Sequence, residues 1–458
     1  LNYYVDPGSG FVFVQNTSFL WAIILGLLGG FLVFLKLFFN FFKKFIWIFL
    51  ILLAILIIGG IMMHKPVAKN KVIVLGIDAM DLHISEQLIK EGKLPNFAQL
   101  KSTGSYSQLA TTIPSESVVA WTSFSTGLNP GSHGIFDFIM RNPKDYSPYL
   151  SLNEALNTQG KVTIKIRKKG DAFWNILSKN KIPCFIYFCP NTFPSEPLLG
   201  KMLSGMGVPD ILGTMGRFSF YTTKTLSEED KDSRGRVIQV NLDKDSILTY
   251  LYGPKVLSGG SQSETKIPLR IILKPNEEKI ALSFQENSLL LKKGEWSDWQ
   301  KISFKIGSFK SVFGIIRFYL KSIEQDFELY ISPINFAPQN PAFPISYPYN
   351  YSKILAKKIG LYYTQGMPSD TWALTENRLD EKAFLEQVDA VLNDRRRILE
   401  EGLKEFKTGL FFFYFDTLDT IQHMFWRYLD PQHPLFEKDP LFQNTIYNYY
   451  EKIDQIVG

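Results

Sequence analysis

The chain has 458 residues, of which 45% are hydrophobic and 21% charged. It can therefore bury a substantial core, it is too long for one ordinary domain, and its composition excludes an intrinsically disordered protein. The net charge of +6 is spread along the sequence and the basic runs at 165–169 and 395–397 are short, which argues against a nucleic-acid polymer as a partner.

Two long apolar segments stand near the N-terminus, after a short segment at 1–18. Residues 19–39 and 45–63 each approach the ~20 residues that a helix needs to cross the hydrocarbon of a bilayer. Lys43 and Lys44 divide them, so we expect a transmembrane hairpin of two helices over 19–64. A cleaved signal peptide is disfavoured, because there are two apolar runs and no early basic region.

The lysines around these segments indicate an orientation. The first 17 residues carry no Lys or Arg, whereas Lys36, Lys43 and Lys44 surround the expected turn. The positive-inside bias then places the turn in the cytoplasm and the following body outside it. The lysines at 65–71 favour the reverse orientation, which stays open. We expect an integral membrane protein with an extracytoplasmic body.

The body alternates apolar runs with helical patterns. An uninterrupted apolar run is typical of a strand covered on both faces, and helices of amphipathic pattern lie between such runs. This alternation predicts a doubly wound α/β core in two parts, 70–217 and 347–458. The strands are expected at 71–77, 182–188 and 410–415, and helices at 84–91 and 381–406.

Residues 218–346 have a different pattern. β-branched and aromatic residues alternate with polar ones, as at 278–284 and 299–306, and Gly259-Gly260 and Lys293-Gly294 supply turns. This predicts an antiparallel β insertion between the two parts of the core. Cys184 and Cys189 lie in an apolar run, where we interpret them as buried small hydrophobic residues and not as a disulfide or metal ligands.

Carboxylates follow two of the expected strands. Asp78 ends the first strand, and Asp416 and Asp419 come after the last one. Ligands of open α/β sheets bind beyond the carboxyl ends of the strands, so these groups should lie near one another. Asp419 and His423 are four residues apart and share one face of a helix. This spacing suits two ligands of a zinc-like ion, and equally an ordinary pair on a helix surface.

A serine also stands at the start of a short apolar helix. Ser117 precedes a run that ends near Gly127. The free backbone N–H groups and the dipole of a helix N-terminus favour an alkoxide and a phosphoryl oxygen, and a bound cation would lower the hydroxyl pKa further. Ser117 could instead be a plain N-cap, a role that is also open to Ser115.

Four motifs in order give these residues a common context. The sequence resembles the type I phosphodiesterase/nucleotide pyrophosphatase family of the alkaline phosphatase superfamily, over roughly 70–215 and 345–458. The fold that this implies is alkaline-phosphatase-like. The motifs are Gly-Ile-Asp-Ala-Met-Asp at 76–81, Leu-Pro-Asn-Phe-Ala-Gln-Leu at 94–100, Trp-Thr-Ser-Phe-Ser-Thr-Gly at 121–127 with Pro-Gly-Ser-His-Gly-Ile-Phe-Asp-Phe at 130–138, and Asp-x-x-x-His-Met-Phe-Trp at 419–426.

The resemblance implies roles for the candidate residues. The nucleophile of the family lies nine residues before the threonine of the Thr-Gly pair, which here is Thr126, and the count leads to Ser117. Asp78 and Ser117 would belong to one metal position. Asp419 and His423 would belong to the other.

The implied chemistry is hydrolysis of a phosphodiester or a nucleotide pyrophosphate by a two-metal enzyme through a covalent phosphoseryl intermediate. The cofactors would be two divalent ions, zinc first, with manganese or magnesium as alternatives. Asp416 and Asp81 are candidates for supporting carboxylates. The expected partners are a membrane and a small-molecule, lipid-linked or glycan-linked phosphoester, and the sequence leaves the oligomeric state open.

Part of the family pattern is missing. Family members carry a later Asp-His-Gly and a further histidine, and this sequence contains no Asp-His dipeptide. Of the remaining histidines, His64, His83, His133 and His433, none matches a family ligand. We therefore expect the chain to be a piece of a longer enzyme. The alternatives are an inactive membrane-tethered binding or scaffold protein, and a phosphonate hydrolase or phosphoglycerol transferase of the same superfamily.

Overall fold

The structure is a computed structural model that describes residues 23–43, 46, 50–54, 70–158, 161–258, 261–307 and 310–458. The chain divides into two units, Leu1–Pro66 and Val67–Gly458. Each unit is described by itself.

The first unit contains one long apolar helix, Ile23–Lys43, with a mean hydropathy of 2.1 over its most apolar window. Its 21 residues span roughly 30 Å, enough to cross a membrane, although a signal sequence has the same length and composition. The described part of the helix includes Lys43, which the sequence pattern assigned to the turn, while residues 19–22 of the expected span 19–39 lie outside the described residues. The segment 1–18 and most of the expected second span, 45–63, lie outside the described residues, so the hairpin is not shown.

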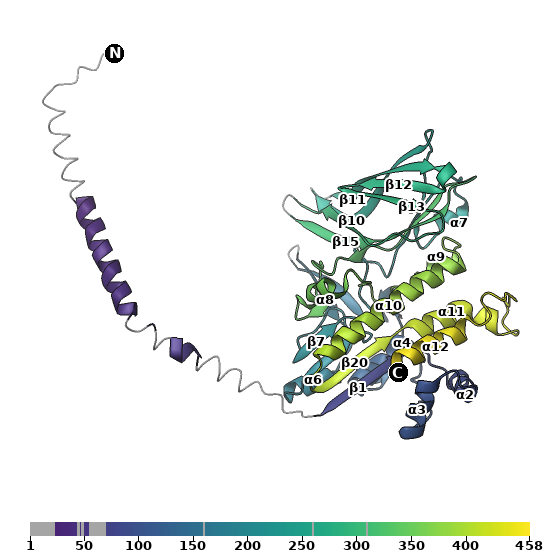
Figure 1. Cartoon of the computed structure of the whole chain (residues 1–458), viewed down its shortest axis with the longest axis horizontal. Helices are drawn as coiled ribbons and strands as arrows, with labels where there is room; N and C mark the ends of the chain where they lie inside the picture. The colour runs from purple at the N-terminus through teal and green to yellow at the C-terminus, as the bar shows by residue number, and fades with distance from the viewer. Residues whose placement is uncertain are drawn as a thin grey trace, which may run out of the picture. The chain divides into compact units, whose positions relative to one another are not determined.

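The second unit is built around a sheet of five strands in the order β1-β20-β6-β7-β19. The first four strands run parallel to one another, and β19 pairs antiparallel with β7. The expected strands are therefore confirmed, and they are neighbours although they lie far apart in sequence (Figure 1). Their bounds are β1 Lys71–Ile77, β20 Gly409–Phe415, β6 Cys184–Tyr187, β7 Gly200–Leu203 and β19 Ser346–Tyr347.

Helices cover both faces of this sheet. Side chains alternate along β20, so Phe411 faces α10, where Gly402 lies against it, and Phe412 faces Trp121 of α4. The mixed α/β core with helices on two sides is thereby confirmed. The helices of the unit are α2 Leu82–Lys90, α3 Pro95–Thr103, α4 Ser117–Thr126, α5 Pro130–His133, α6 Phe173–Lys179, α7 Glu228–Lys231, α8 Tyr351–Ile359, α9 Thr371–Thr375, α10 Glu381–Glu405, α11 Thr417–Leu429 and α12 Thr445–Val457, with a 3-10 turn η1 at Pro275–Glu277.

One expectation about the first strand was wrong. The apolar run of β1 predicted cover on both faces, but the first half of the strand is exposed. β1 is also an edge strand among the described residues and pairs with β20 alone. Val72 and Ile73 are each 51% exposed, and burial begins only toward the carboxyl end, at Gly76 and Asp78. The strand is thus buried where it carries the candidate site and exposed where it enters the sheet.

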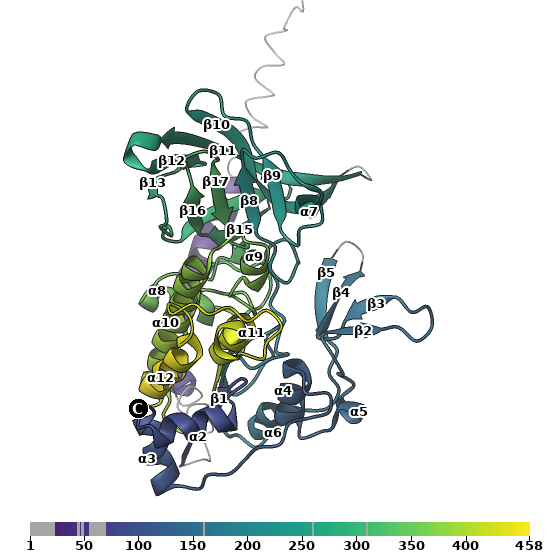
Figure 2. The same ribbon diagram turned by 90° about the vertical axis from the view of Figure 1, so that its right-hand side faces the viewer.

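The β-rich region begins at β8 and ends at β18. It contains sheets β10-β11-β12-β13, β14-β15-β18 and β16-β17-β8-β9, which lie together at one end of the body (Figures 1 and 2). The pairing is antiparallel as predicted, except that β8 and β9 are parallel. The division of the body at 218 and 346 stays a prediction. The bounds are β8 Ser219–Thr222, β9 Arg236–Gln239, β10 Ser246–Ser258, β11 Ser261–Lys274, β12 Lys279–Phe284, β13 Asn287–Lys292, β14 Gln300–Lys305, β15 Ser311–Ile316, β16 Phe318–Ser322, β17 Glu328–Ile331 and β18 Asn335–Phe336.

Two hairpins separate α5 from α6. They are β2 Ile139–Arg141 with β3 Pro148–Leu150, and β4 Asn153–Thr158 with β5 Lys161–Ile166. Both cysteines are free and buried, as expected. Cys184 lies in β6, and Cys189 lies beyond its end.

Candidate functional site

Asp78 lies where β1 ends and is 8% exposed. Its backbone N–H continues the parallel pairing with β20. Three side chains donate hydrogen bonds to its carboxylate: Ser117 Oγ to Oδ2 at 2.9 Å, Trp121 Nε1 to Oδ1 at 2.9 Å, and Tyr414 OH to Oδ2 at 2.7 Å. The sheet and α4 therefore hold this carboxylate in one orientation.

Two electrostatic effects act on Asp78. Burial raises the pKa of its carboxyl above the ordinary value, and the negative charge of Asp419 raises it further. The three hydrogen bonds lower the pKa in part, because they stabilise the ionised form. The raised pKa makes the carboxylate a better proton acceptor than an exposed aspartate.

Ser117 is the first residue of α4, and Glu116 occupies the N-cap position without a capping side-chain hydrogen bond. The Ser117 hydroxyl thus donates to Asp78, and Glu116, not Ser117, stands at the N-cap position, while the role of Ser117 as a nucleophile stays a prediction. Ser115 is exposed and does not line the neighbouring cavity. The half-buried Ser117 does line it, at the N-terminal end of a helix ten residues long.

Asp419 and His423 lie on one face of α11, as their spacing predicted. His423 Nε2 lies 3.4 Å from Asp419 Oδ1, and the two side chains are 73% and 27% exposed. The hydrogen bond with Asp419 is the main cause that raises the pKa of His423, which favours the imidazolium form. Both residues line the same cavity as Ser117, so the structure brings together all four predicted site residues.

The two supporting carboxylates have different surroundings. Asp416 lines the cavity and is 8% exposed, with Oδ2 lying 3.6 Å from Nη2 of the buried Arg395. Asp416 Oδ1 is buried and has no hydrogen-bond partner among the described residues. Asp81, in contrast, caps α2 by accepting from the backbone N–H of Ile84 at 2.8 Å, and it is not among the residues that line the cavity. Asp416 is therefore the better placed of the two.

The other histidines lie away from this arrangement. His133 is fully buried, where Nδ1 accepts from the backbone N–H of Ile135 and Nε2 contacts Ser123 Oγ at 2.9 Å. Burial lowers the pKa of His133, so it is a neutral structural residue. His83 is exposed on α2 and His433 lies in a loop, while His64 is outside the described residues.

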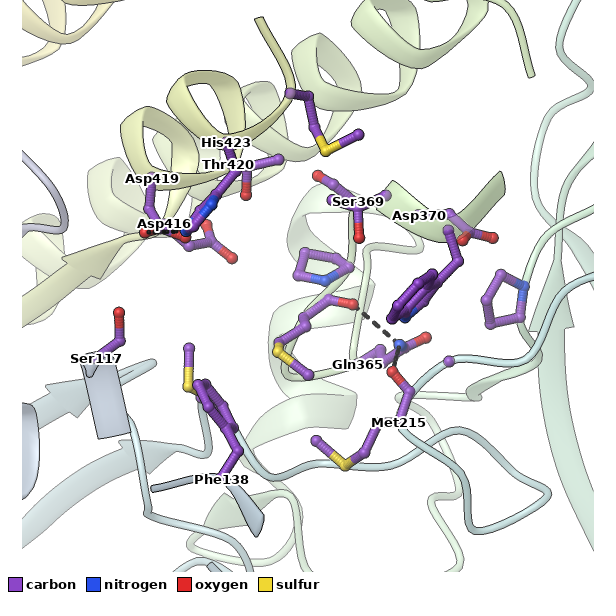
Figure 3. A pocket seen from close by; sticks show the side chains of 18 of the residues that line it. Ser117, Phe138, Met215, Gln365, Ser369, Asp370, Asp416, Asp419, Thr420 and His423 are labelled. Atoms are coloured by element: carbon purple, nitrogen blue, oxygen red, sulfur yellow. Dashed lines mark hydrogen bonds and ion pairs between the residues drawn. The ribbon is translucent and has the colours of Figure 1, made fainter. Parts of the chain in front are cut away.

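The site opens into a cavity of about 520 Å³. Figure 3 shows Ser117 and Phe138 along one side, the carboxylates and His423 of α11 opposite Ser117, and Met215 and Gln365 farther along the cavity. The volume lies within the ~300–1,000 Å³ of sites that hold organic ligands. The polar groups therefore occupy one end of a space large enough for an extended substrate.

The donor atoms are of types that bind divalent cations, but they are too few at each position. Carboxylate, hydroxyl and imidazole groups are suitable ligands, and the unpartnered Asp416 Oδ1 adds one more oxygen. Within the described ranges, however, no group of three His, Cys, Asp or Glu side chains is arranged to hold an ion. Two protein donors at each position fall short of the three that catalytic zinc sites use. These residues alone do not form a complete metal site.

Sequence reasoning missed Trp121 and Tyr414, which hold the Asp78 carboxylate. Both stand inside apolar runs, where an aromatic residue is typical of the core. A signal was available, because a buried Tyr or Trp normally finds an acceptor for its polar hydrogen, and Asp78 ends β1, the strand that pairs with the β20 strand of Tyr414 and lies against Trp121 of α4.

Fold and site together define a class: an α/β protein with a serine hydroxyl, a buried carboxylate and a carboxylate–imidazole pair at the carboxyl ends of parallel strands. Residues 72–244 match the family model of type I phosphodiesterase / nucleotide pyrophosphatase, so the chain carries a domain of this family, and the family resemblance is confirmed. The matched range includes Asp78 and Ser117, while Asp419 and His423 lie beyond it. No curated protein and no solved structure matches the chain. The family indicates hydrolysis of phosphoesters.

Proposed function

We propose that the protein hydrolyses phosphoesters with Ser117 as the nucleophile. The observation that carries this proposal is the hydrogen bond from Ser117 Oγ to Asp78 Oδ2, 2.9 Å long, at the edge of the cavity. It pairs a hydroxyl with a carboxylate whose pKa is raised by burial, which is the arrangement of a nucleophile and its proton acceptor.

The reaction follows from this pair. Ser117 Oγ attacks phosphorus while its proton passes to Asp78, the bond from phosphorus to the leaving oxygen breaks, the leaving group departs as an anion that solvent protonates, and a phosphoseryl ester remains. The amide groups at the start of α4 favour the negative charge on the phosphoryl oxygens. Water then attacks phosphorus and loses a proton to solvent, and the bond from phosphorus to Oγ breaks as Asp78 returns its proton to Oγ, which releases the phosphate product and restores the hydroxyl.

Divalent cations are part of the proposal, with zinc first and manganese or magnesium as alternatives. Asp78 with Ser117 would hold one ion and Asp419 with His423 the other, and the ions would supply positive charge to the phosphoryl group. No step above depends on them, because each position has only two donors in the described chain. Calorimetric titration with zinc tests this point: saturable binding that Asp78→Asn and His423→Ala each weaken supports it, and no binding rejects it.

A membrane anchor is also proposed. The apolar helix Ile23–Lys43 supports it, together with the predicted second span, and the lysines at 36, 43 and 44 support an extracytoplasmic body. If the helix is an anchor, the protein should stay in the membrane pellet after alkaline carbonate washing and be released by detergent. Release by carbonate alone, or loss of the helix from the mature protein, would favour a signal sequence.

The second candidate is a membrane-tethered binding protein without catalysis. The observation that favours it is the incomplete set of metal donors among the described residues. It predicts affinity for a phosphoester without turnover, whereas the first candidate predicts turnover. The same assay, run with a matched monoester, diester and phosphonate, shows which of the three substrates the protein hydrolyses.

The deciding experiment compares Ser117→Ala with Ser115→Ala, an exposed serine two residues away. Hydrolysis of bis(p-nitrophenyl) phosphate and of p-nitrophenyl phosphate is measured with each divalent cation. We expect Ser117→Ala to reduce hydrolysis to the background rate and Ser115→Ala to retain it. A phosphoseryl peptide that contains residue 117, trapped by acid quenching and detected by mass spectrometry, would identify the intermediate. Full activity of Ser117→Ala would reject the mechanism.

A further inference from the structure

The cavity that Ser117 lines is rich in methionine. Met206, Met215, Met367 and Met424 line it, four of the nine methionines of the chain. They come from three segments: the loop between β7 and β8, which carries Met206 and Met215, the loop before α9, and α11. Four long thioether side chains gathered on one cavity require an explanation, because the core of the unit is built mainly from other apolar residues.

These methionines extend the apolar core that supports the nucleophile. Met206 is 5% exposed and belongs to one cluster with Val118 and Val119, the two residues that follow Ser117 in α4. Met215 and Met367 pack against the same cluster, as does Phe138. The apolar wall therefore begins next to the reacting hydroxyl, and whatever group is bonded to the phosphate meets it first.

A polar framework fixes the two methionine loops. The amide nitrogen of Gln365 donates to the backbone carbonyls of Met215 and Met367, both at 2.9 Å (Figure 3). Gln365 is 4% exposed, and Gly216 beside it has a φ of 121° and no room for a side chain, since a Cβ would lie 2.3 Å from the Gln365 amide nitrogen. The loops are thus held in position, and each methionine side chain that they carry is unbranched, with three rotatable bonds.

We propose that this cavity takes a phosphoester whose esterified group is a flexible apolar chain, such as an alkyl, acyl or prenyl chain. The inference rests on the proposed function and names its substrate class. Methionine is unbranched and adapts to apolar partners of variable shape, and its sulfur is only a weak hydrogen-bond acceptor.

A nucleoside or a sugar fits this wall less well. Its base edge or hydroxyl groups would need several hydrogen-bond partners to replace those lost from water. Both amide hydrogens of Gln365 are already used on backbone carbonyls, which leaves its Oε1, without a hydrogen-bond partner among the described residues, as the one free group of that amide. The Asp370 carboxylate accepts from Tyr330 OH at 2.6 Å and from the backbone N–H of Ala373 at 3.0 Å. An apolar chain makes no such demand.

The test is a series of p-nitrophenyl phosphodiesters whose second ester is methyl, butyl, hexyl or octyl, compared with the thymidine ester. We expect kcat/KM of the wild-type protein to rise with chain length, by up to about fourfold for each methylene that enters the cavity. The thymidine ester should be no better than the butyl ester. A rate independent of chain length, or a preference for thymidine, overturns the inference.

Substitutions in the cavity wall test whether the methionines cause the dependence of the rate on chain length. Met215→Gln and Met367→Gln place an amide in the wall, so the ratio of the octyl to the methyl rate should fall by about tenfold or more. Met140→Gln, in β2 and outside the cavity, is the matched control and should keep the wild-type ratio. An unchanged ratio in both cavity variants also overturns the inference.

A further measurement separates this inference from the proposed function. Hydrolysis that requires Ser117 but ignores chain length rejects the inference alone. If no ester is hydrolysed, the proposed function fails, and calorimetry of octylphosphonate and methylphosphonate with the Ser117→Ala protein decides the inference. Tighter binding of octylphosphonate supports it, and equal or absent binding rejects it.

Discussion

The hydroxyl of Tyr414 offers the most direct test of the site. Tyr414 is 1% exposed, and its OH donates to Asp78 Oδ2 at 2.7 Å while its ring packs on Trp121 with centroids 5.0 Å apart. Tyr414→Phe keeps the ring and removes the donor. A hydrogen bond to an ionised group contributes about 1.5–3 kcal/mol, so the free energy of unfolding should fall by that amount while Asp78 is charged. Urea unfolding at neutral pH, with an unchanged slope, measures it.

The same change should slow hydrolysis. Oδ2 accepts from both Ser117 and Tyr414, so the variant leaves this oxygen with the nucleophile as its remaining donor. Looser orientation of the carboxylate should lower kcat by about tenfold, which corresponds to roughly 1.4 kcal/mol of the barrier. The assay is hydrolysis of bis(p-nitrophenyl) phosphate at saturating substrate.

Tyr187→Phe is the matched control. Tyr187 is also fully buried in a neighbouring strand, but its OH meets the neutral OH of Tyr351 at 2.6 Å. Loss of the Tyr187 hydroxyl should lower the free energy of unfolding by only about 0.5–1.5 kcal/mol and leave kcat unchanged. If the two variants lose equal stability and both retain full activity, the claim that Tyr414 holds a charged catalytic carboxylate is refuted.

Three further changes test other parts of the core. Gly76→Ala should destabilise the protein by about 1–3 kcal/mol, because a Cβ there would lie 2.7 Å from the ring of Trp121; an unchanged urea midpoint would contradict this. Arg395→Met should lower the free energy of unfolding by about 3–5 kcal/mol, because it leaves the buried Asp416 without the guanidinium 3.6 Å away. Adding Asp416→Asn should recover part of this loss in the same urea assay. Burial raises the pKa of Asp370 to about 7. The stability that its buried, protonated carboxyl contributes is therefore fully present below about pH 4 and is lost as the pH rises through 7. Asp370→Asn should remove this fall in the free energy of unfolding, and wild-type and variant curves against pH that stay parallel would disprove the prediction.

The sequence was sufficient to predict the strands and the helix that hold the candidate site. An apolar run that ends in a carboxylate located β1 and Asp78, and an apolar run followed by a D-x-x-x-H helix located β20 and α11. Because the carboxyl ends of parallel strands share one edge, the sequence alone could place together residues that are more than 300 positions apart. The exposure of β1 could not be predicted, since the apolar pattern does not state how many neighbours a strand has.

Asp81, a predicted supporting carboxylate, has a local role that its sequence position also predicts. The first turn of α2 leaves backbone N–H groups without partners, and the Asp81 side chain accepts from one of them. An aspartate before Leu82-His-Ile was already an N-cap signal. The local requirement of the helix decides its orientation, and the distant active site does not.

The substrate end of the cavity could not be predicted from the sequence for a different reason. Its wall is built by loops at 205–216 and 365–372, where Gly, Pro and Met specify turns and apolar character but no common surface. Only the fold shows that Met215 and Met367 face the same space and that one glutamine fixes both. The proposed chemistry would use groups at strand ends, whose position is set by topology, whereas the proposed specificity would use loops, whose position is set by contacts such as those of Gln365. The chain-length series therefore tests the part of the protein about which its sequence says least.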